Sequence, residues 1–113
     1  MKGNIGSACY NLTAHSTVVV SAHGMAMVPL NRRMANPPGF FLLLLSRSGL
    51  AKKGLVNLGG VIEADYRGPV CTILVNSADE EFILKRGQRC CQGVFLPTHD
   101  AEFTRVDVLE KTE

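Results

Sequence analysis

The sequence of 113 residues predicts an all-β domain. Its apolar segments are short, rich in β-branched residues and separated by Gly, Pro, Asn and Asp, a pattern typical of strands joined by turns. No window of a dozen residues keeps the 3.6-residue apolar period of an amphipathic helix. Many short strands at regular spacing indicate a sandwich or a closed barrel. The length suits a single domain with a single core.

Seven segments are expected to form strands, in the order Thr17–Val20, Met25–Pro29, Phe40–Leu45, Val56–Leu58, Val70–Asn76, Glu81–Leu84 and Cys90–Phe95. Turn residues such as those of Asn36–Gly39 lie between them. Asp107–Lys111 is compatible with a short helical turn. Because Phe40–Leu45 is apolar throughout, both faces of this strand should be covered. One face would meet the core, and the other either a second sheet or another subunit.

Composition and charge exclude several kinds of partner. The net charge is +2 and the basic residues are scattered, so no nucleic-acid partner is expected. The longest apolar run, Phe40–Leu45, is too short to span a membrane. No signal peptide is recognisable at the amino terminus, so we expect an intracellular protein, in the cytoplasm or nucleus. Cys9, Cys71, Cys90 and Cys91 lack metal-ligand spacing and are expected to be free thiols, the adjacent pair pointing to opposite faces of a strand.

The most informative segment is Gly59–Val70, with the sequence GGVIEADYRGPV. Glycines flank two carboxylates and an aromatic residue, which predicts a β-hairpin whose turn approaches a ligand closely. The Glu63 carboxylate could deprotonate a water, and the Tyr66 ring could cover a sugar. We expect Asp65 and Arg67 to form a local ion pair that closes the hairpin.

A second segment, Ser46–Gly49, combines small residues with an arginine. Exposed backbone amides, the Ser48 hydroxyl and the Arg47 guanidinium together form an anion site in chemical terms.

Four segments together resemble the motifs of the dUTPase family. GSACYNL (Gly6–Leu12) resembles motif 1, SRSG (Ser46–Gly49) motif 2, Gly59–Val70 motif 3, and GQRCCQ (Gly87–Gln92) motif 4. The resemblance implies a jelly-roll-like β-barrel and a homotrimer whose active sites take motifs from different subunits. It further implies hydrolysis of dUTP to dUMP and pyrophosphate, with Mg²⁺ bound mainly through the substrate phosphates.

The resemblance also implies roles for individual residues. Glu63 stands at the position of the water-activating carboxylate. Phosphate binding would fall to Arg47, Ser48, Gly49 and Gln92, and nucleoside binding to Asn57, Gly60 and Tyr66. Asn11 stands where the family has an aspartate that contacts the waters of the bound Mg²⁺.

Several positions depart from the family pattern. Asn11 lacks the charge of the aspartate, Glu63 is one methylene longer than the usual aspartate, and Gln88 replaces another aspartate. We expect residues 1–113 to be a single dUTPase-like domain without the Gly-rich arm of motif 5. Reduced hydrolysis of dUTP is the favoured interpretation. The alternative is a catalytically inactive dUTPase-like protein that binds a nucleotide or a protein partner. The compact, divergent sequence resembles viral or retroelement members, which would place it in a host cell.

Overall fold

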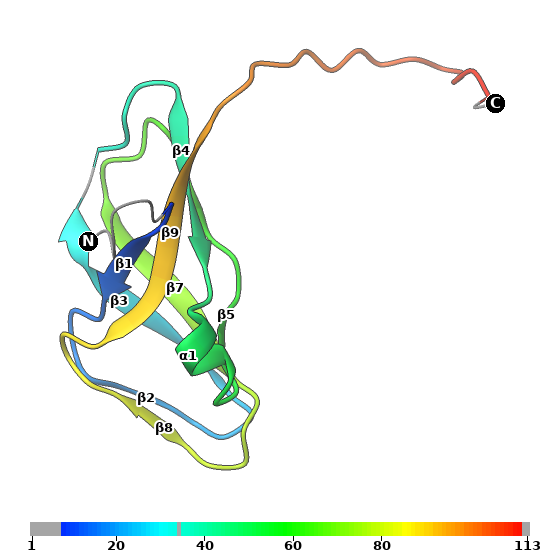
Figure 1. Ribbon diagram of the computed structural model, residues 1–113. Coiled ribbons are helices and arrows are strands. Elements are labelled where there is room, and N and C mark those ends of the chain that lie inside the picture. The colour runs from blue at the N-terminus through cyan, green and yellow to red at the C-terminus, as the bar shows by residue number, and fades with distance from the viewer. Residues whose placement is uncertain (1–7, 34, 112–113) are drawn as a thin grey trace.

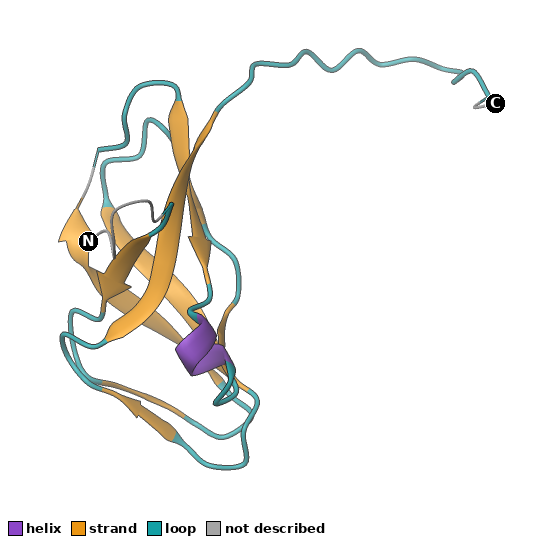
Figure 2. Ribbon diagram, in the orientation of Figure 1, coloured by secondary structure: helices purple, strands orange, loops and turns teal. Residues whose placement is uncertain are grey.

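The computed structural model describes residues 8–33 and 35–111. The elements are β1 (Tyr10–Thr13), β2 (Val18–Val20), β3 (Met25–Arg33), β4 (Phe40–Leu45), α1 (Ser48–Ala51), β5 (Leu55–Asn57), β6 (Val61–Ile62), β7 (Pro69–Asn76), β8 (Phe82–Leu84) and β9 (Arg89–Pro97). Strands dominate this part of the chain (Figure 2), which confirms the all-β class. Gly6 and Ser7 of the expected motif 1 lie outside the described residues.

The strands are hydrogen-bonded into three sheets, with the orders β1-β9-β4-β6, β3-β7-β5 and β2-β8. Buried side chains from all three sheets form one apolar core, which contains Leu42 of β4, Leu74 of β7 and Leu84 of β8. Within residues 8–33 and 35–111 the ladders do not join into one continuous ring. The barrel-like body in Figure 1 therefore consists of separate sheets packed around a shared core.

Strand β4 has the expected bounds, and its two faces differ in burial. Leu42 and Leu44 are buried in the core, whereas on the opposite face Phe41 and Leu43 are half-buried and Leu45 is 37% exposed. The inner face is thus covered as expected. The outer face is only partly covered by the described residues, which leaves room for another subunit.

The connection between β6 and β7 differs from the expected hairpin. β6 pairs with β4, whereas β7 pairs with β3 and β5, so the prediction that Gly59–Val70 is a hairpin is wrong. The Gly60 carbonyl accepts a hydrogen bond of 2.9 Å from the Leu44 amide, which directs the chain onto the edge of β4. The segment therefore crosses from one sheet to another.

The helical prediction is wrong as well. Asp107–Lys111 forms no helical turn, because Val108 and Leu109 are 84% and 80% exposed and lack the packing that an isolated turn needs. The segment from residue 98 to 111 instead extends away from the body (Figure 1). The short helix α1 lies in the Ser46–Gly49 region, where none was expected.

Cys90 and Cys91 are both buried and their side chains are hydrogen-bonded to each other, so the prediction that they point to opposite faces is wrong. Leu12 pairs with Cys91 and Thr13 pairs with Arg89, so Cys90 is an extra residue in the ladder. Such a β-bulge interrupts the strict alternation of side chains. Both thiols are free, as expected. A hydrogen bond with Cys90 and burial raise the pKa of the Cys91 thiol.

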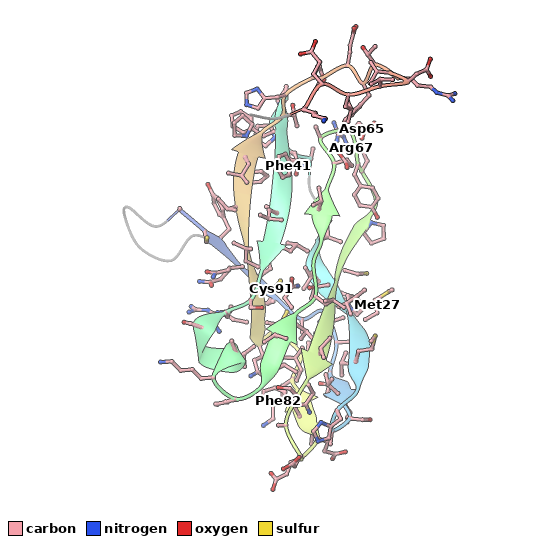
Figure 3. The ribbon with its side chains drawn as sticks, turned by 90° about the vertical axis from the view of Figure 1, so that its right-hand side faces the viewer. Met27, Phe41, Asp65, Arg67, Phe82 and Cys91 are labelled. Carbon is pink, nitrogen blue, oxygen red and sulfur yellow. The ribbon has the colours of Figure 1, made fainter. Side chains whose placement is uncertain are left out.

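The outer face of the β3-β7-β5 sheet is apolar. We define the methionine face as Met25, Met27, Val56, Ile73 and Val75, in which Met25 pairs with Val75, Met27 with Ile73, and Val56 with Val75. Met25 and Met27 are each 66% exposed, and the Met27 side chain points outward in Figure 3. A continuous, exposed apolar face of this kind is typical of a surface that binds another molecule.

Asn76 links β7 to the β2-β8 sheet. Its side-chain nitrogen donates to the carbonyl oxygens of Val20 (3.1 Å) and Glu80 (2.8 Å), and its side-chain oxygen accepts from the Ala78 amide (3.0 Å). The residue is 1% exposed. One amide therefore joins β7 to the β2-β8 sheet through a fully satisfied set of bonds.

Replacing Asn76→Ala should lower the free energy of unfolding by about 2–4 kcal/mol, because buried carbonyl groups lose their donors. Urea unfolding at one fixed protein concentration measures this loss. Ser77→Ala is the control, since Ser77 is exposed and its hydroxyl donates to the Gly54 carbonyl, outside the contacts that Asn76 makes. Equal midpoints for Asn76→Ala and the unmodified chain would contradict the assigned role.

Candidate functional site

A row of polar residues crosses the β1-β9-β4 part of the largest sheet. Gln92 of β9 pairs with Asn11 of β1 on one side and with Leu45 of β4 on the other. The chain leaves β4 at Ser46, whose carbonyl oxygen accepts a hydrogen bond of 2.9 Å from the Gln92 side chain. The sheet thus brings together residues from the expected motifs 1, 2 and 4.

The turn after β4 places the basic and small residues beside this row. Arg47 immediately precedes α1, and its carbonyl oxygen accepts from the amides of Leu50 (3.2 Å) and Ala51 (2.9 Å). Ser48 and Gly49 are exposed, and Arg47 is half-buried. The pKa of Cys90 is lowered mainly by its hydrogen bond with Cys91, and the Arg47 charge acts in the same direction. The positive charge of Arg47 therefore acts electrostatically on a residue of β9.

Asn57 is half-buried and hydrogen-bonded to several neighbouring segments. Its backbone amide donates to the Ser46 hydroxyl (2.8 Å). With the side-chain amide oriented to satisfy its neighbours, its nitrogen donates to the Gly59 carbonyl (2.8 Å) and its oxygen accepts from the Thr72 hydroxyl. Asn57 therefore connects the turn after β4 to the glycines that precede β6.

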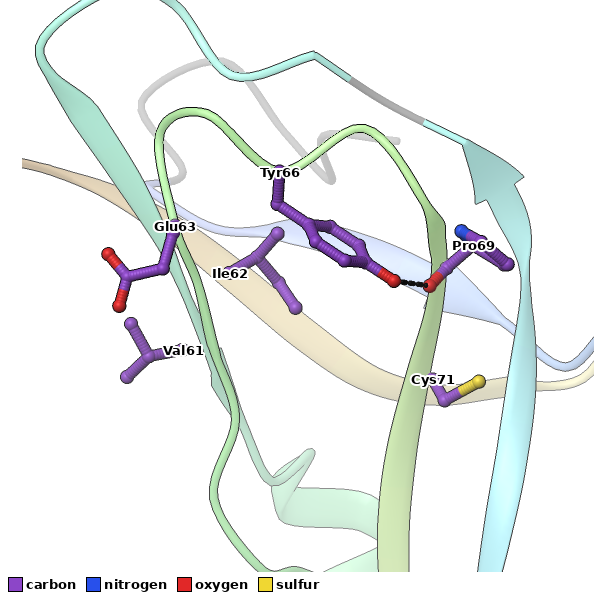
Figure 4. A pocket seen from close by; sticks show the side chains of 6 residues that line it. All are labelled: Val61, Ile62, Glu63, Tyr66, Pro69 and Cys71. Atoms are coloured by element: carbon purple, nitrogen blue, oxygen red, sulfur yellow. Dashed lines mark hydrogen bonds between the residues drawn. The ribbon is translucent and has the colours of Figure 1, made fainter.

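The second group of expected site residues surrounds a pocket of about 280 Å³ (Figure 4), lined by Val61, Ile62, Glu63, Tyr66, Pro69 and Cys71. The Tyr66 hydroxyl donates a hydrogen bond of 2.6 Å to the Pro69 carbonyl. A Cβ atom at Gly68 would lie 2.5 Å from the Tyr66 hydroxyl oxygen, so only glycine leaves room for the ring. Glu63 is exposed, and its carboxylate points away from the ring.

The expected ion pair between Asp65 and Arg67 is absent from the described residues. Arg67 instead donates from Nη1 to the carbonyl oxygens of Ala64 and Tyr66, each at 3.0 Å. The turn directs these two carbonyls toward the guanidinium group, and they replace the carboxylate as its partners.

The two groups of site residues lie at different levels of the same sheet. Ile62, which precedes Glu63, pairs with Leu42, whereas Ser46 lies four residues further along the chain. At the rise of an extended strand, this separation is about 13 Å. Figure 3 shows Asp65 and Arg67 toward one end of the molecule. A single chain therefore does not bring Glu63 beside Arg47 and Gln92.

Asn36 is a site residue that sequence reasoning missed. It is 5% exposed, and its side chain donates to the carbonyl oxygens of Ile62 (2.9 Å) and Glu63 (3.2 Å). In the sequence it reads as one of several turn residues before Pro37 and Pro38. No local pattern distinguishes its buried role, because both of its partners are 26 or 27 residues away.

The described residues contain no group of three His, Cys, Asp or Glu side chains that could hold a metal ion. Asn11 contributes an amide oxygen near Gln92, and this neutral donor suits contact with metal-bound water better than direct ligation. No helix in the described part of the chain is long and apolar enough to cross a membrane.

Solved structures with the same fold are dUTPases. The chain superimposes on a dUTPase of Staphylococcus bacteriophage 80alpha with dUpNHpp at a TM-score of 0.87, with 23% identity and coverage of 100% of this chain and 83% of the other. A dUTPase of EIAV gives a TM-score of 0.80, with 24% identity and coverage of 94% and 88%. A phage phi11 dUTPase with a TM-score of 0.87 and 22% identity is described as coordinating a structural Mg(II) ion.

Sequence relatives are more informative about family. The chain is 41% identical to a deoxyuridine 5'-triphosphate nucleotidohydrolase of Oryza sativa, covering 98% of this chain and 66% of that protein. It is 34% identical to the enzyme of the same name in Caulobacter vibrioides, with coverage of 96% and 75%. A putative nucleotidohydrolase of Frog virus 3 is 37% identical over 100% of this chain and 70% of its own length. The dUTPase family model matches residues 1–113, and the chain therefore belongs to the dUTPase family.

Proposed function

We propose that the protein hydrolyses dUTP to dUMP and pyrophosphate, at a rate reduced by its altered motifs. The observation that carries this proposal is the joint presence of a polar row beside Arg47 and a pocket containing Glu63 and Tyr66. Relatives with up to 41% identity are named deoxyuridine 5'-triphosphate nucleotidohydrolases, which supports the same reaction here.

The polar row would bind the phosphates. The Arg47 guanidinium supplies charge-assisted hydrogen bonds, and Ser48, Gly49 and Gln92 supply further donors. The Mg²⁺ that the family implies would be held mainly by the phosphates, with Asn11 contacting its waters, and it would neutralise phosphate charge. The neutral Asn11 binds such an ion more weakly than an aspartate would.

The pocket would hold the nucleoside and the base. The Tyr66 ring, fixed by its bond to Pro69 and by the space at Gly68, would cover the deoxyribose. The backbone near Gly60 would read the uracil, while Asn57 supports this segment from below. The exposed Glu63 carboxylate would deprotonate the attacking water. Its extra methylene places the oxygens away from the position that an aspartate would give.

The active form would be a homotrimer whose sites are shared between subunits. A general base must lie within hydrogen-bond reach of its water, and about 13 Å along β4 separates the two groups of residues in one chain. The methionine face is exposed and apolar, and it continues along β7 to Cys71 in the wall of the pocket. A second copy packed on this face would bury it and bring its own polar row toward the pocket.

Replacing Glu63→Asp should raise kcat for dUTP by about tenfold or more, because misplacement on the order of 1 Å costs up to ~10²-fold in rate. Pyrophosphate release with Mg²⁺ measures the change, with UTP and dTTP as substrate controls. Glu63→Gln is the matched variant and should abolish turnover. An unchanged rate in Glu63→Gln would remove Glu63 from the mechanism.

Mixing two inactive variants tests the shared site. Arg47→Ala and Glu63→Gln should each be inactive, and co-refolding them in equal amounts should restore about a quarter of the unmodified activity if each site takes these residues from two neighbouring subunits. Sites built within one chain would recover nothing. Sedimentation of the same samples reports whether trimers form, so failed assembly is distinguished from an unshared site.

A further inference from the structure

Asn36 is a buried amide whose donor bonds fall on the segment that carries the proposed base. It lies in the loop between β3 and β4 and is 5% exposed. Its Nδ2 donates to the backbone carbonyl oxygens of both Ile62 and Glu63, at 2.9 and 3.2 Å. One side chain therefore bonds to the backbone of Glu63 and of the residue before it.

The Glu63 carbonyl oxygen accepts two hydrogen bonds, one of them from Asn36. It accepts a second hydrogen bond, of 3.1 Å, from the amide of Tyr66. Asn36 thus restrains the turn that carries both the carboxylate and the aromatic ring. The other support for this segment is limited, because β6 has two residues and pairs with β4 at Leu42 and Leu43.

The other half of the Asn36 amide has no partner among the described residues. Its Oδ1 is buried without a hydrogen bond, whereas the corresponding oxygen of Asn76 accepts from Ala78. Leaving a buried acceptor unpaired costs free energy, so an asparagine is a poor choice here for stability alone. What the asparagine does provide is the two hydrogen bonds that its Nδ2 donates to the turn of Glu63.

We propose that Asn36 is a positioning residue for the Glu63 carboxylate. The expected effect of Asn36 on catalysis rests on the proposed function. Asn36 holds the carbonyl groups of the two peptide units that flank the Glu63 Cα, and so fixes the direction in which the Glu63 side chain leaves the chain. Asn36→Asp keeps the shape of the side chain and removes both donors. Asn76→Asp makes the same change in a second buried asparagine, which also donates to two carbonyls but lies at the opposite end of β7 from the pocket residues Pro69 and Cys71.

Steady-state hydrolysis of dUTP by the full chain is the first readout. Asn36→Asp should lower kcat by about 10- to 100-fold and change KM by less than about threefold, because the base is displaced while phosphate binding is unaffected. Asn76→Asp should lower the midpoint of urea unfolding but leave kcat per folded molecule unchanged. Equal losses of kcat in the two variants would overturn the proposal, since both would then reflect general destabilisation.

Amide hydrogen exchange is the second readout and does not depend on activity. Asn36→Asp should speed exchange of the Tyr66 amide at least tenfold, and Asn76→Asp should leave it unchanged. If Asn36→Asp does not fold, Asn36→Ala is measured in the same way. If the unmodified chain fails to hydrolyse dUTP, the proposed function fails. Exchange of the Tyr66 amide then tests by itself whether Asn36 restrains the Glu63 turn. An unchanged exchange rate in the Asn36 variant would overturn this role.

Discussion

The site depends on the pairing of β9 with two strands at once. β9 lies between β1 and β4, and this arrangement aligns Asn11, Gln92 and Leu45 although they come from the beginning, the end and the middle of the chain. The bond from Gln92 to the Ser46 carbonyl then fixes the exit of the chain from β4. Without the central position of β9, the segment around Arg47 would lose Gln92 and Asn11 as polar neighbours.

Much of the fold follows from local sequence, and much of the site does not. The six apolar residues of Phe40–Leu45 predict β4 with its observed bounds, because apolarity and β-propensity are local properties. The hairpin prediction at Gly59–Val70 is wrong because the sequence does not reveal that β6 joins β4 while β7 joins β3 and β5. Pairing between distant strands is set by the whole core, and no turn pattern encodes it.

Family resemblance locates Arg47, Glu63, Tyr66 and Gln92, and the structure adds how they are supported. The half-buried Asn57 connects the turn after β4 to the glycines before β6, and the buried Asn36 holds the turn of Glu63. Most of their partners are backbone carbonyls, which every residue carries. The supporting roles of these two asparagines can be recognised only when the burial of the side chain and the distances to its hydrogen-bond partners are both known.

The bulge at Cys90 also limits how this part of the chain can evolve. The pairing of β1 with β9 depends on the number of residues in this segment. Because Cys90 is an extra residue, Leu12 pairs with Cys91 while Thr13 pairs with Arg89. Deleting one residue here would change the register between Arg89 and Gln92, and a slip of one residue turns side chains to the opposite face. Exchange of either cysteine for another small apolar residue would leave the count intact. Variation in this segment is therefore constrained more in length than in side-chain identity.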